Sequence, residues 1–223
     1  MPAARAHDQD ASAGGRRRKR HLKISAGQAW NLHEAWRFAV WIGRAPTLFV
    51  TINWRFAPSS TYPDSIARMS RVRDCMKSFL HRHTGQGPVW MEVREDPKSR
   101  GDHVHLALYV PAWLEPAFRK ALKGWVSMDA QGMEGRAIKT KPIYDWVGLQ
   151  RYFLKGATRE VRQLFSVPPR HSPFQGVIHG PRVRVSHSIG PTARKAAGFA
   201  TAANRGLAAI AWQRPADGPW RAS

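Results

Sequence analysis

Residues 102–111 constrain the fold most, because they form an alternating run with two histidines near its start. Side chains alternate across a strand with a period of two, so His103 and His105 point to one face. The intervening apolar residues point to the other face and are expected to be core: Val104, Leu106, Leu108 and Val110. Two imidazoles on one face of a strand suit a metal ion. The alternative is a strand with two polar, half-exposed histidines.

The remaining segments predict helices and further strands. Apolar residues recur at helical spacing in residues 26–42, about 64–83, about 112–126 and 144–157, and an Ala-rich helix is expected at about 191–210. Strand patterns lie at residues 48–54, 89–94, 136–143 and 183–186, besides the histidine strand. This order predicts an α+β fold with a central antiparallel sheet and helices packed on it.

Composition divides the chain into three parts. Residues 1–22 are polar, rich in Ala and Gly, and basic, so we expect a disordered tail. Residues 23–190 carry most of the helix and strand patterns and form the predicted folded domain. Residues 191–223 add a C-terminal helix and a loose tail. Within the first part, residues 16–20 read Arg-Arg-Arg-Lys-Arg, which is either a phosphate-binding arm or a solvated segment.

The chain is strongly basic, with 36 Lys and Arg against 15 Asp and Glu and a net charge of +21. From Arg151 to the C-terminus, 12 basic residues stand against two acidic ones, Glu160 and Asp217. An excess of this size indicates a polyanion, and nucleic acid is the first candidate partner. An anionic membrane surface is a distant second, because the basic clusters do not lie on an evident amphipathic helix.

Several classes of protein are disfavoured. No apolar run reaches the ~18 residues of a membrane span and no signal peptide is evident at the start, so we expect a soluble, cytoplasmic protein. The single cysteine, Cys75, cannot form an internal disulfide. No Gly-x-x-x-x-Gly-Lys-Ser/Thr phosphate loop is present, so the sequence offers no ATP-driven motor.

Glu92 is the first candidate for a third metal ligand. It lies off the apolar side of the strand before the histidines, which consists of Val89, Met91 and Val93. Across a hairpin, Glu92 would then share the polar face with His103 and His105. Two imidazoles and one carboxylate leave open positions on a divalent ion, as catalysis requires. The alternative is a surface glutamate paired with an arginine.

Tyr152 and Lys155 are candidates for a nucleophile and its supporting cation. They are three residues apart on a predicted helix and therefore share a face. Trp146, Leu149 and Phe153 would pack that helix on the sheet. A phenol has a pKa near 10, so it becomes a good nucleophile only where a cation stabilises the phenolate. The alternative is a packing tyrosine beside a lysine whose stem lies along the protein surface.

These groups occur in the order found in the HUH (His-hydrophobe-His) endonuclease superfamily. The segment from Glu92 through His103-Val104-His105 to Val110-Pro111 resembles its second motif. Tyr152-Phe153-Leu154-Lys155 resembles the Tyr-x-x-Lys of the third motif, and residues 49–54 are similar to the first. The resemblance covers roughly residues 26–190, and it is greatest to the single-tyrosine rolling-circle replication initiators.

The resemblance implies an RRM-like nuclease domain that nicks and joins single-stranded DNA at a replication origin through a 5′-phosphotyrosine link. Tyr152 would be the nucleophile, assisted by Lys155. A divalent ion, Mg²⁺ or Mn²⁺, would be held by His103, His105 and Glu92. Residues expected to contact the DNA are Thr51, Asn53, Arg151 and Arg159. The superfamily's helicase domain is missing, so a separate host helicase would unwind the duplex, and the protein would act in a bacterial cytoplasm.

Two features depart from the family pattern. The gap between Glu92 and His103 is longer than in compact viral members, which makes Glu95 or Asp96 the alternative third ligand. Tyr144 lies eight residues before Tyr152, so a two-tyrosine mechanism is not expected. Three other functions stay open: a non-catalytic nucleic-acid-binding module of the same fold, a relaxase or transposase of the same superfamily, and a zinc hydrolase of unrelated fold.

Overall fold

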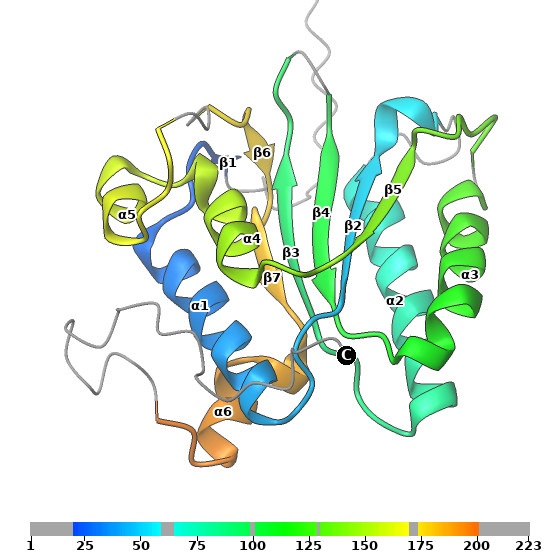
Figure 1. The fold of residues 1–223 in the computed structure, drawn as a ribbon. Helices are drawn as coiled ribbons and strands as arrows, with labels where there is room; N and C mark the ends of the chain where they lie inside the picture. Colours follow the sequence, from blue (N-terminus) through cyan, green and yellow to red (C-terminus); the bar gives the residue numbers. More distant parts are fainter. Residues whose placement is uncertain (1–19, 59–64, 99–100, 129, 170–173, 201–223) are drawn as a thin grey trace, which may run out of the picture.

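The centre of the molecule is a five-stranded antiparallel sheet with the strand order β5-β2-β4-β3-β7 (Figure 1). Its strands are β2 (Leu48–Asn53), β3 (Trp90–Glu95), β4 (His103–Leu108), β5 (Ile138–Pro142) and β7 (Val183–Val185). This computed structural model describes residues 20–58, 65–98, 101–128, 130–169 and 174–200. The predicted α+β fold with helices packed on an antiparallel sheet is confirmed.

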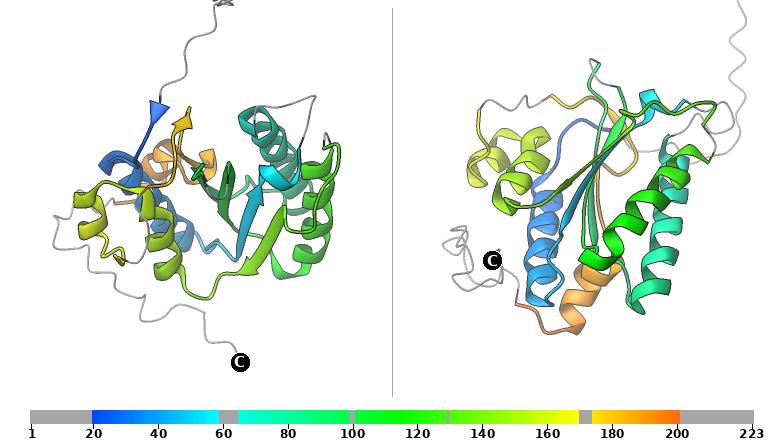
Figure 2. Two further views of the ribbon diagram at one scale, coloured as in Figure 1. Left: turned by 90° about the horizontal axis from the view of Figure 1, so that it is seen from above. Right: turned by 45° about the vertical axis from the view of Figure 1, so that its right-hand side comes forward.

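Helices cover both faces of the sheet (Figure 2). One face is covered by α1 (Ala26–Trp41) and α4 (Trp146–Phe153), and the other by α2 (Ser65–Thr84) and α3 (Glu115–Ser127). Two hydrophobic clusters result, one on each side of the sheet. Every residue of β3 and of β4 is therefore buried. This differs from the expectation that these strands have one apolar and one polar face.

Local signals explain where the two helices on the first face begin. Ser25 caps α1 in a capping box with Gln28, in which each side chain bonds the other residue's backbone N–H. Asp145 caps α4 by accepting a hydrogen bond from the Gly148 N–H at 2.9 Å. The helix predicted over residues 144–157 is shorter, because α4 ends at Phe153 and the chain tightens into a 3-10 turn.

Short elements escaped the sequence prediction. They are β1 (Arg20–His21) and β6 (Ile178–His179), which pair with each other, and α5 (Arg159–Leu164). The helix expected at 191–210 is shorter than predicted: α6 covers Pro191–Ala196, and Gly198 follows in the left-handed region at φ +64°. Residues 201–210 of that prediction lie outside the described residues. The expected disordered tail and its arginine run also lie outside them, except at their last residues.

The buried guanidinium of Arg182 joins the small β1–β6 sheet to the main one. It donates to the backbone carbonyls of His21 at 3.1 Å, of Arg94 at 3.3 Å and of Gly176. Gly176 has φ +74°, and a Cβ there would collide with the Asp96 carbonyl oxygen, so only glycine fits. Among the described helices, none is long and apolar enough to cross a membrane.

Candidate metal centre

His103 and His105 project from β4 toward the face covered by α1 and α4, and both are almost fully buried. Their Nε2 atoms converge on a single carboxylate oxygen, Glu95 Oε2, at 3.1 Å and 3.4 Å. Glu95 is the last residue of β3 and lies directly opposite His103 in the β3–β4 register. The antiparallel pairing thus brings the carboxylate and both imidazoles to one point.

Each imidazole is held by its other nitrogen. His103 Nδ1 donates to the backbone carbonyl of Gly101 at 2.8 Å, which fixes the ring with Nε2 toward Glu95. His105 Nδ1 lies 3.0 Å from the hydroxyl of Thr51, its cross-strand neighbour on β2. Metal-binding histidines are typically oriented in this way by a partner on the second nitrogen.

The donor atoms of Glu95, His103 and His105 fit a metal ion. One such atom from each residue lies within 4.8 Å of the others. Ligands bonded to one ion at about 2.0–2.2 Å lie roughly 3 Å apart, and the two Nε2 atoms lie 3.1 Å and 3.4 Å from Glu95 Oε2. The second oxygen, Glu95 Oε1, is buried and makes no hydrogen bond within the described structure. A buried carboxylate oxygen without a donor is costly unless a cation shares it.

Electrostatics favour the protonation states that a metal requires. Burial would by itself raise the pKa of Glu95, but hydrogen bonds from His103 and His105, with the charge of Lys155, hold that pKa well below its usual range. Burial lowers the pKa of His105 to about 4, although Glu95 opposes the shift. At neutral pH the centre therefore presents an anionic carboxylate beside a neutral His105 imidazole, the forms that bind metal.

Glu92 is not part of this centre, so the first-choice ligand was wrong and the alternative Glu95 takes its place. Glu92 pairs with Leu106 across β3–β4 and lies on the opposite face of the sheet. There Arg73 of α2 donates to both of its carboxylate oxygens, at 2.8 Å and 3.0 Å. The other alternative, Asp96, follows β3 and does not belong to the metal-binding group among the described residues.

Tyr152 and Lys155 both reach the centre from α4 and the turn after it. The Tyr152 hydroxyl lies 3.2 Å from His105 Nε2. The Lys155 ammonium lies 2.8 Å from Glu95 Oε2 and 3.6 Å from the centroid of the Tyr152 ring. Lys155 is 5% exposed, so its charge is buried against the carboxylate and the phenol ring. The expectation that this pair shares one face is confirmed.

The centre opens into a pocket of about 480 Å³. Thr51 and Asn53, two of the residues predicted to contact DNA, line it. Arg151 and Arg159 are not among its lining residues, although both were expected to contact DNA. The residues that sequence reasoning missed are cationic or aromatic: Arg55, Phe56, Arg136 and Lys139. Only the pairing of β5 with β2, which places Lys139 opposite Thr51, would have revealed part of this wall.

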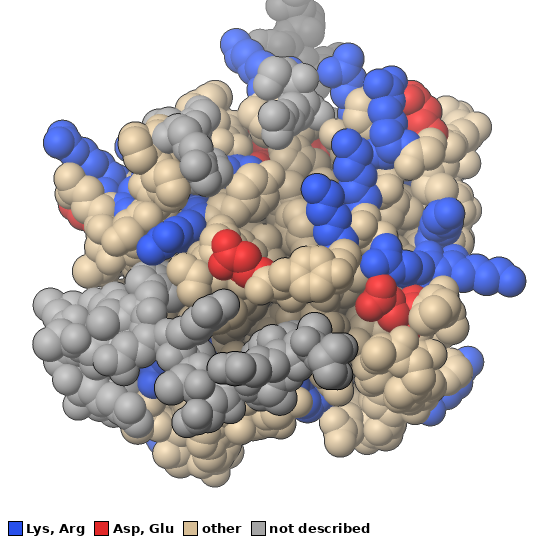
Figure 3. Space-filling view, in the orientation of Figure 1, with Lys and Arg blue, Asp and Glu red and all other residues tan. Residues whose placement is uncertain are grey.

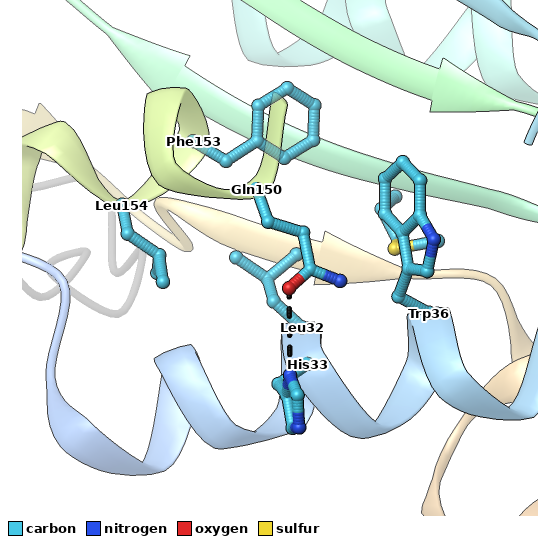
Figure 4. Close-up of a pocket in the computed structure, with 7 residues that line it drawn as sticks. Leu32, His33, Trp36, Gln150, Phe153 and Leu154 are labelled. Atoms are coloured by element: carbon cyan, nitrogen blue, oxygen red, sulfur yellow. Dashed lines mark hydrogen bonds between the residues drawn. The ribbon is translucent and has the colours of Figure 1, made fainter. Parts of the chain in front are cut away.

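A second, water-sized cavity of about 10 Å³ lies beneath α4 (Figure 4). His33 of α1 and Gln150 of α4 meet there, with His33 Nδ1 at 3.5 Å from Gln150 Oε1. Burial lowers the pKa of His33, so the imidazole is neutral at pH 7. The surrounding side chains are apolar, with Trp36 and Phe153 among them. This polar contact ties the helix that carries Tyr152 to the core helix α1.

Comparisons with known proteins do not identify a family for this chain. Family models, curated proteins and solved structures were each compared with the chain, and none matches. Membership of the HUH superfamily therefore stays a prediction from the motifs. What the structure establishes is a buried Glu-His-His group that can hold a metal ion, with a tyrosine hydroxyl and a lysine ammonium beside it.

Proposed function

We propose that this protein is a metal-dependent endonuclease and strand transferase that cleaves single-stranded DNA with Tyr152 as its nucleophile. The observation that carries the proposal is the position of the Tyr152 hydroxyl, 3.2 Å from Nε2 of the candidate ligand His105. A phenol oxygen this close to a metal ligand can reach a phosphate bound at the same centre. The basic composition of the chain, with its net charge of +21, fits a nucleic-acid substrate.

Glu95, His103 and His105 would hold a divalent ion, Mg²⁺ or Mn²⁺, which supplies Lewis-acid activation of the scissile phosphate. The partners on both Nδ1 atoms fix the two imidazoles with Nε2 toward that position. Lys155 contacts the same carboxylate oxygen, Glu95 Oε2, and helps to hold the carboxylate in place. The protein thus prearranges all three donors before the substrate arrives, which lowers the cost of reorganisation during the reaction.

Tyr152 performs the covalent step. Its hydroxyl oxygen attacks the phosphorus and forms the phosphotyrosine bond, while the bond from phosphorus to the 3′ oxygen breaks. The phenol proton passes to solvent and the departing 3′ oxygen takes up a proton, so the exchange needs no external oxidant or energy source. Lys155 places a positive charge beside the ring, where it stabilises negative charge that develops during attack. The reverse reaction joins a 3′-hydroxyl strand to the linked 5′ phosphate.

The biological setting follows from the resemblance to rolling-circle initiators. A nick that leaves a free 3′-hydroxyl primes DNA synthesis, and the stored phosphotyrosine bond permits later joining. Initiation at a replication origin, with unwinding by a separate host helicase, is therefore the process that we assign to this chemistry. A relaxase or a single-tyrosine transposase would use the same centre on a different replicon, so the chemistry and the process are tested separately.

The chemistry is tested by incubating the full chain with Mn²⁺ and a labelled single-stranded DNA library that has a random central segment. A covalent adduct resistant to denaturant is expected, and peptide mass spectrometry should locate it at Tyr152. Tyr152→Phe should abolish the adduct. Tyr144→Phe is the matched control, because Tyr144 is 89% exposed and does not line the pocket.

Two outcomes would contradict the proposed chemistry. An adduct that persists in Tyr152→Phe would assign the nucleophile elsewhere. DNA binding without any metal-dependent adduct would favour a non-catalytic binding module of the same fold. Sequencing of the adducted strands then gives the preferred cleavage site, and a plasmid or phage carrying that site tests the role in replication.

A further inference from the structure

Two lysines of the edge strand β5 lie on the same face of the sheet as the metal centre. Lys139 pairs with Thr51 and Lys141 pairs with Phe49 across the antiparallel β2–β5 ladder. Thr51 holds His105, and the ring of Phe49 stacks on that imidazole with centroids 5.5 Å apart. Both lysines are exposed. Figure 3 shows Lys and Arg side chains gathered over the part of the surface where β5 runs.

Arg136 and Phe56 form a flat platform in the same pocket as Tyr152. The Arg136 guanidinium carbon lies 4.0 Å from the centroid of the Phe56 ring, so the two planar groups are in contact. An exposed ion pair with Glu134 also holds Arg136, with Nε 2.6 Å from the carboxylate. The Arg136 side chain is nevertheless 62% exposed, which leaves area on which another planar group can stack.

We propose that Phe56, Arg136, Lys139 and Lys141, here called the β5 track, hold the DNA strand beside Tyr152. The two lysines bind successive phosphates, and the Arg136–Phe56 platform stacks one unpaired base. This inference rests on the proposed function and deepens it, because it assigns the path of the strand and a base-binding subsite. It also explains a requirement for single strands, since a base can lie on the platform only when it has left the duplex stack.

The arrangement matches what single-strand binding requires. Residues two apart on a strand lie about 6.6 Å apart, so the two ammonium groups can follow the backbone of an extended polynucleotide. Protein surfaces that bind single-stranded DNA or RNA combine such a row of cationic side chains with aromatic or other planar side chains. The β5 track has both, and it ends at the pocket that contains the Tyr152 hydroxyl.

The phosphate contacts are tested by fluorescence anisotropy with a labelled single-stranded oligonucleotide at several salt concentrations. The full chain carries Tyr152→Phe and EDTA is present, so cleavage cannot affect the result. Lys139→Gln with Lys141→Gln should raise Kd roughly tenfold and reduce the salt slope by about 1.4, at ~0.7 for each lost phosphate contact. The matched control is Lys120→Gln with Lys123→Gln, which removes two exposed charges from α3 on the opposite side of the sheet.

The base subsite is tested with Arg136→Lys, which keeps the charge and removes the planar group. Binding should weaken about fivefold or more, as expected for the loss of one stacked base. An oligonucleotide with a single abasic position should show the same loss with the parent protein but little further loss with Arg136→Lys. Arg82→Lys, at an exposed position near the end of α2, is the matched control.

Two results would contradict the proposal that the β5 track binds DNA. Equal weakening by the β5 pair and the α3 pair would show a general effect of net charge. An abasic scan that affects the parent and Arg136→Lys proteins equally would remove the base subsite. Because binding is measured without cleavage, a failure of the adduct experiment would leave these results intact, and a failure here would leave Tyr152 chemistry intact.

Discussion

The two faces of the central sheet each bury a glutamate from β3, and they use it differently. On one face, Arg73 donates hydrogen bonds to both oxygens of Glu92, so the negative charge of Glu92 is neutralised within an ion pair. On the other face, three groups share one oxygen of Glu95 while its second oxygen has no hydrogen-bond partner in the described structure. A complete pairing indicates a role in the fold, whereas a carboxylate oxygen that accepts no hydrogen bond beside two imidazoles indicates a ligand site.

The largest effect is expected when Glu92 is replaced, and it is a loss of folding stability. Glu92→Gln leaves the partly buried Arg73 guanidinium without its carboxylate, which should lower the free energy of unfolding by about 3 kcal/mol. Urea denaturation measures the loss, and titration with Mn²⁺ should show unchanged metal affinity. The double variant Glu92→Leu with Arg73→Met should regain much of the stability, because it removes both charges together. A weaker metal affinity in Glu92→Gln would contradict the assignment of roles.

Glu95→Gln, unlike Glu92→Gln, should weaken metal binding. It keeps the shape of the side chain and removes the anionic ligand, so metal affinity should fall by more than about 100-fold, beyond the usual effect of a partner that only orients a ligand. Calorimetric titration with Mn²⁺ measures the loss, and Glu92→Gln is the matched control. Retained affinity would show that the Glu-His-His group is not the metal site.

A smaller effect is expected when an orienting partner is removed. Thr51→Val deletes the hydroxyl that lies 3.0 Å from His105 Nδ1 and keeps the β-branched shape. Metal affinity should fall about tenfold, with little change in the circular dichroism spectrum. Thr47→Val is the control, because the Thr47 hydroxyl bonds backbone groups of Val110 and not a histidine. An unchanged affinity would mean that packing alone orients His105.

An effect of similar size to that of Thr51→Val is expected in the pH dependence of the stability of the metal-free protein. The folded-state pKa of His105, about 4, is below the ordinary value of 6.5. The folded protein therefore binds fewer protons, and stability is complete above pH 6.5 and falls as the pH drops toward 4. Between pH 6.5 and pH 5 the loss from this group should be about 1–2 kcal/mol. Denaturation in EDTA measures it, and His105→Gln should flatten the slope; an equal slope in both proteins would contradict the shift.

The sequence predicted the elements that have a clear period and the residues whose face could be inferred from them. The β2 and β4 assignments were correct because Thr51 and His105 alternate with apolar neighbours on both strands. The same reasoning failed for β3, since both faces of that strand are covered and its apolar residues Met91 and Val93 lie on the histidine face with Glu95. Alternation gives the two sets of side chains but not which set faces the metal.

The remaining errors concern contacts between distant segments. Arg73 is 19 residues before Glu92 and lies on a different element, so no local pattern indicates that they pair. The β1 and β6 strands have two residues each, which is too short for any periodicity. The wall of the pocket formed by Arg136 and Lys139 depends on the register of β5 against β2, which becomes visible only once the sheet is assembled.

The position of β5 at the end of the sheet order has one more consequence. A strand at the margin of a sheet offers backbone groups to strands of other molecules, and lysines on such a strand discourage that association. Lys139 and Lys141 are therefore placed to discourage this association, in addition to the contact with DNA that we propose for them. Replacing both lysines should increase light scattering at high protein concentration. A bound oligonucleotide that neutralises the two lysines would have to cover the exposed edge of β5 to prevent the same association.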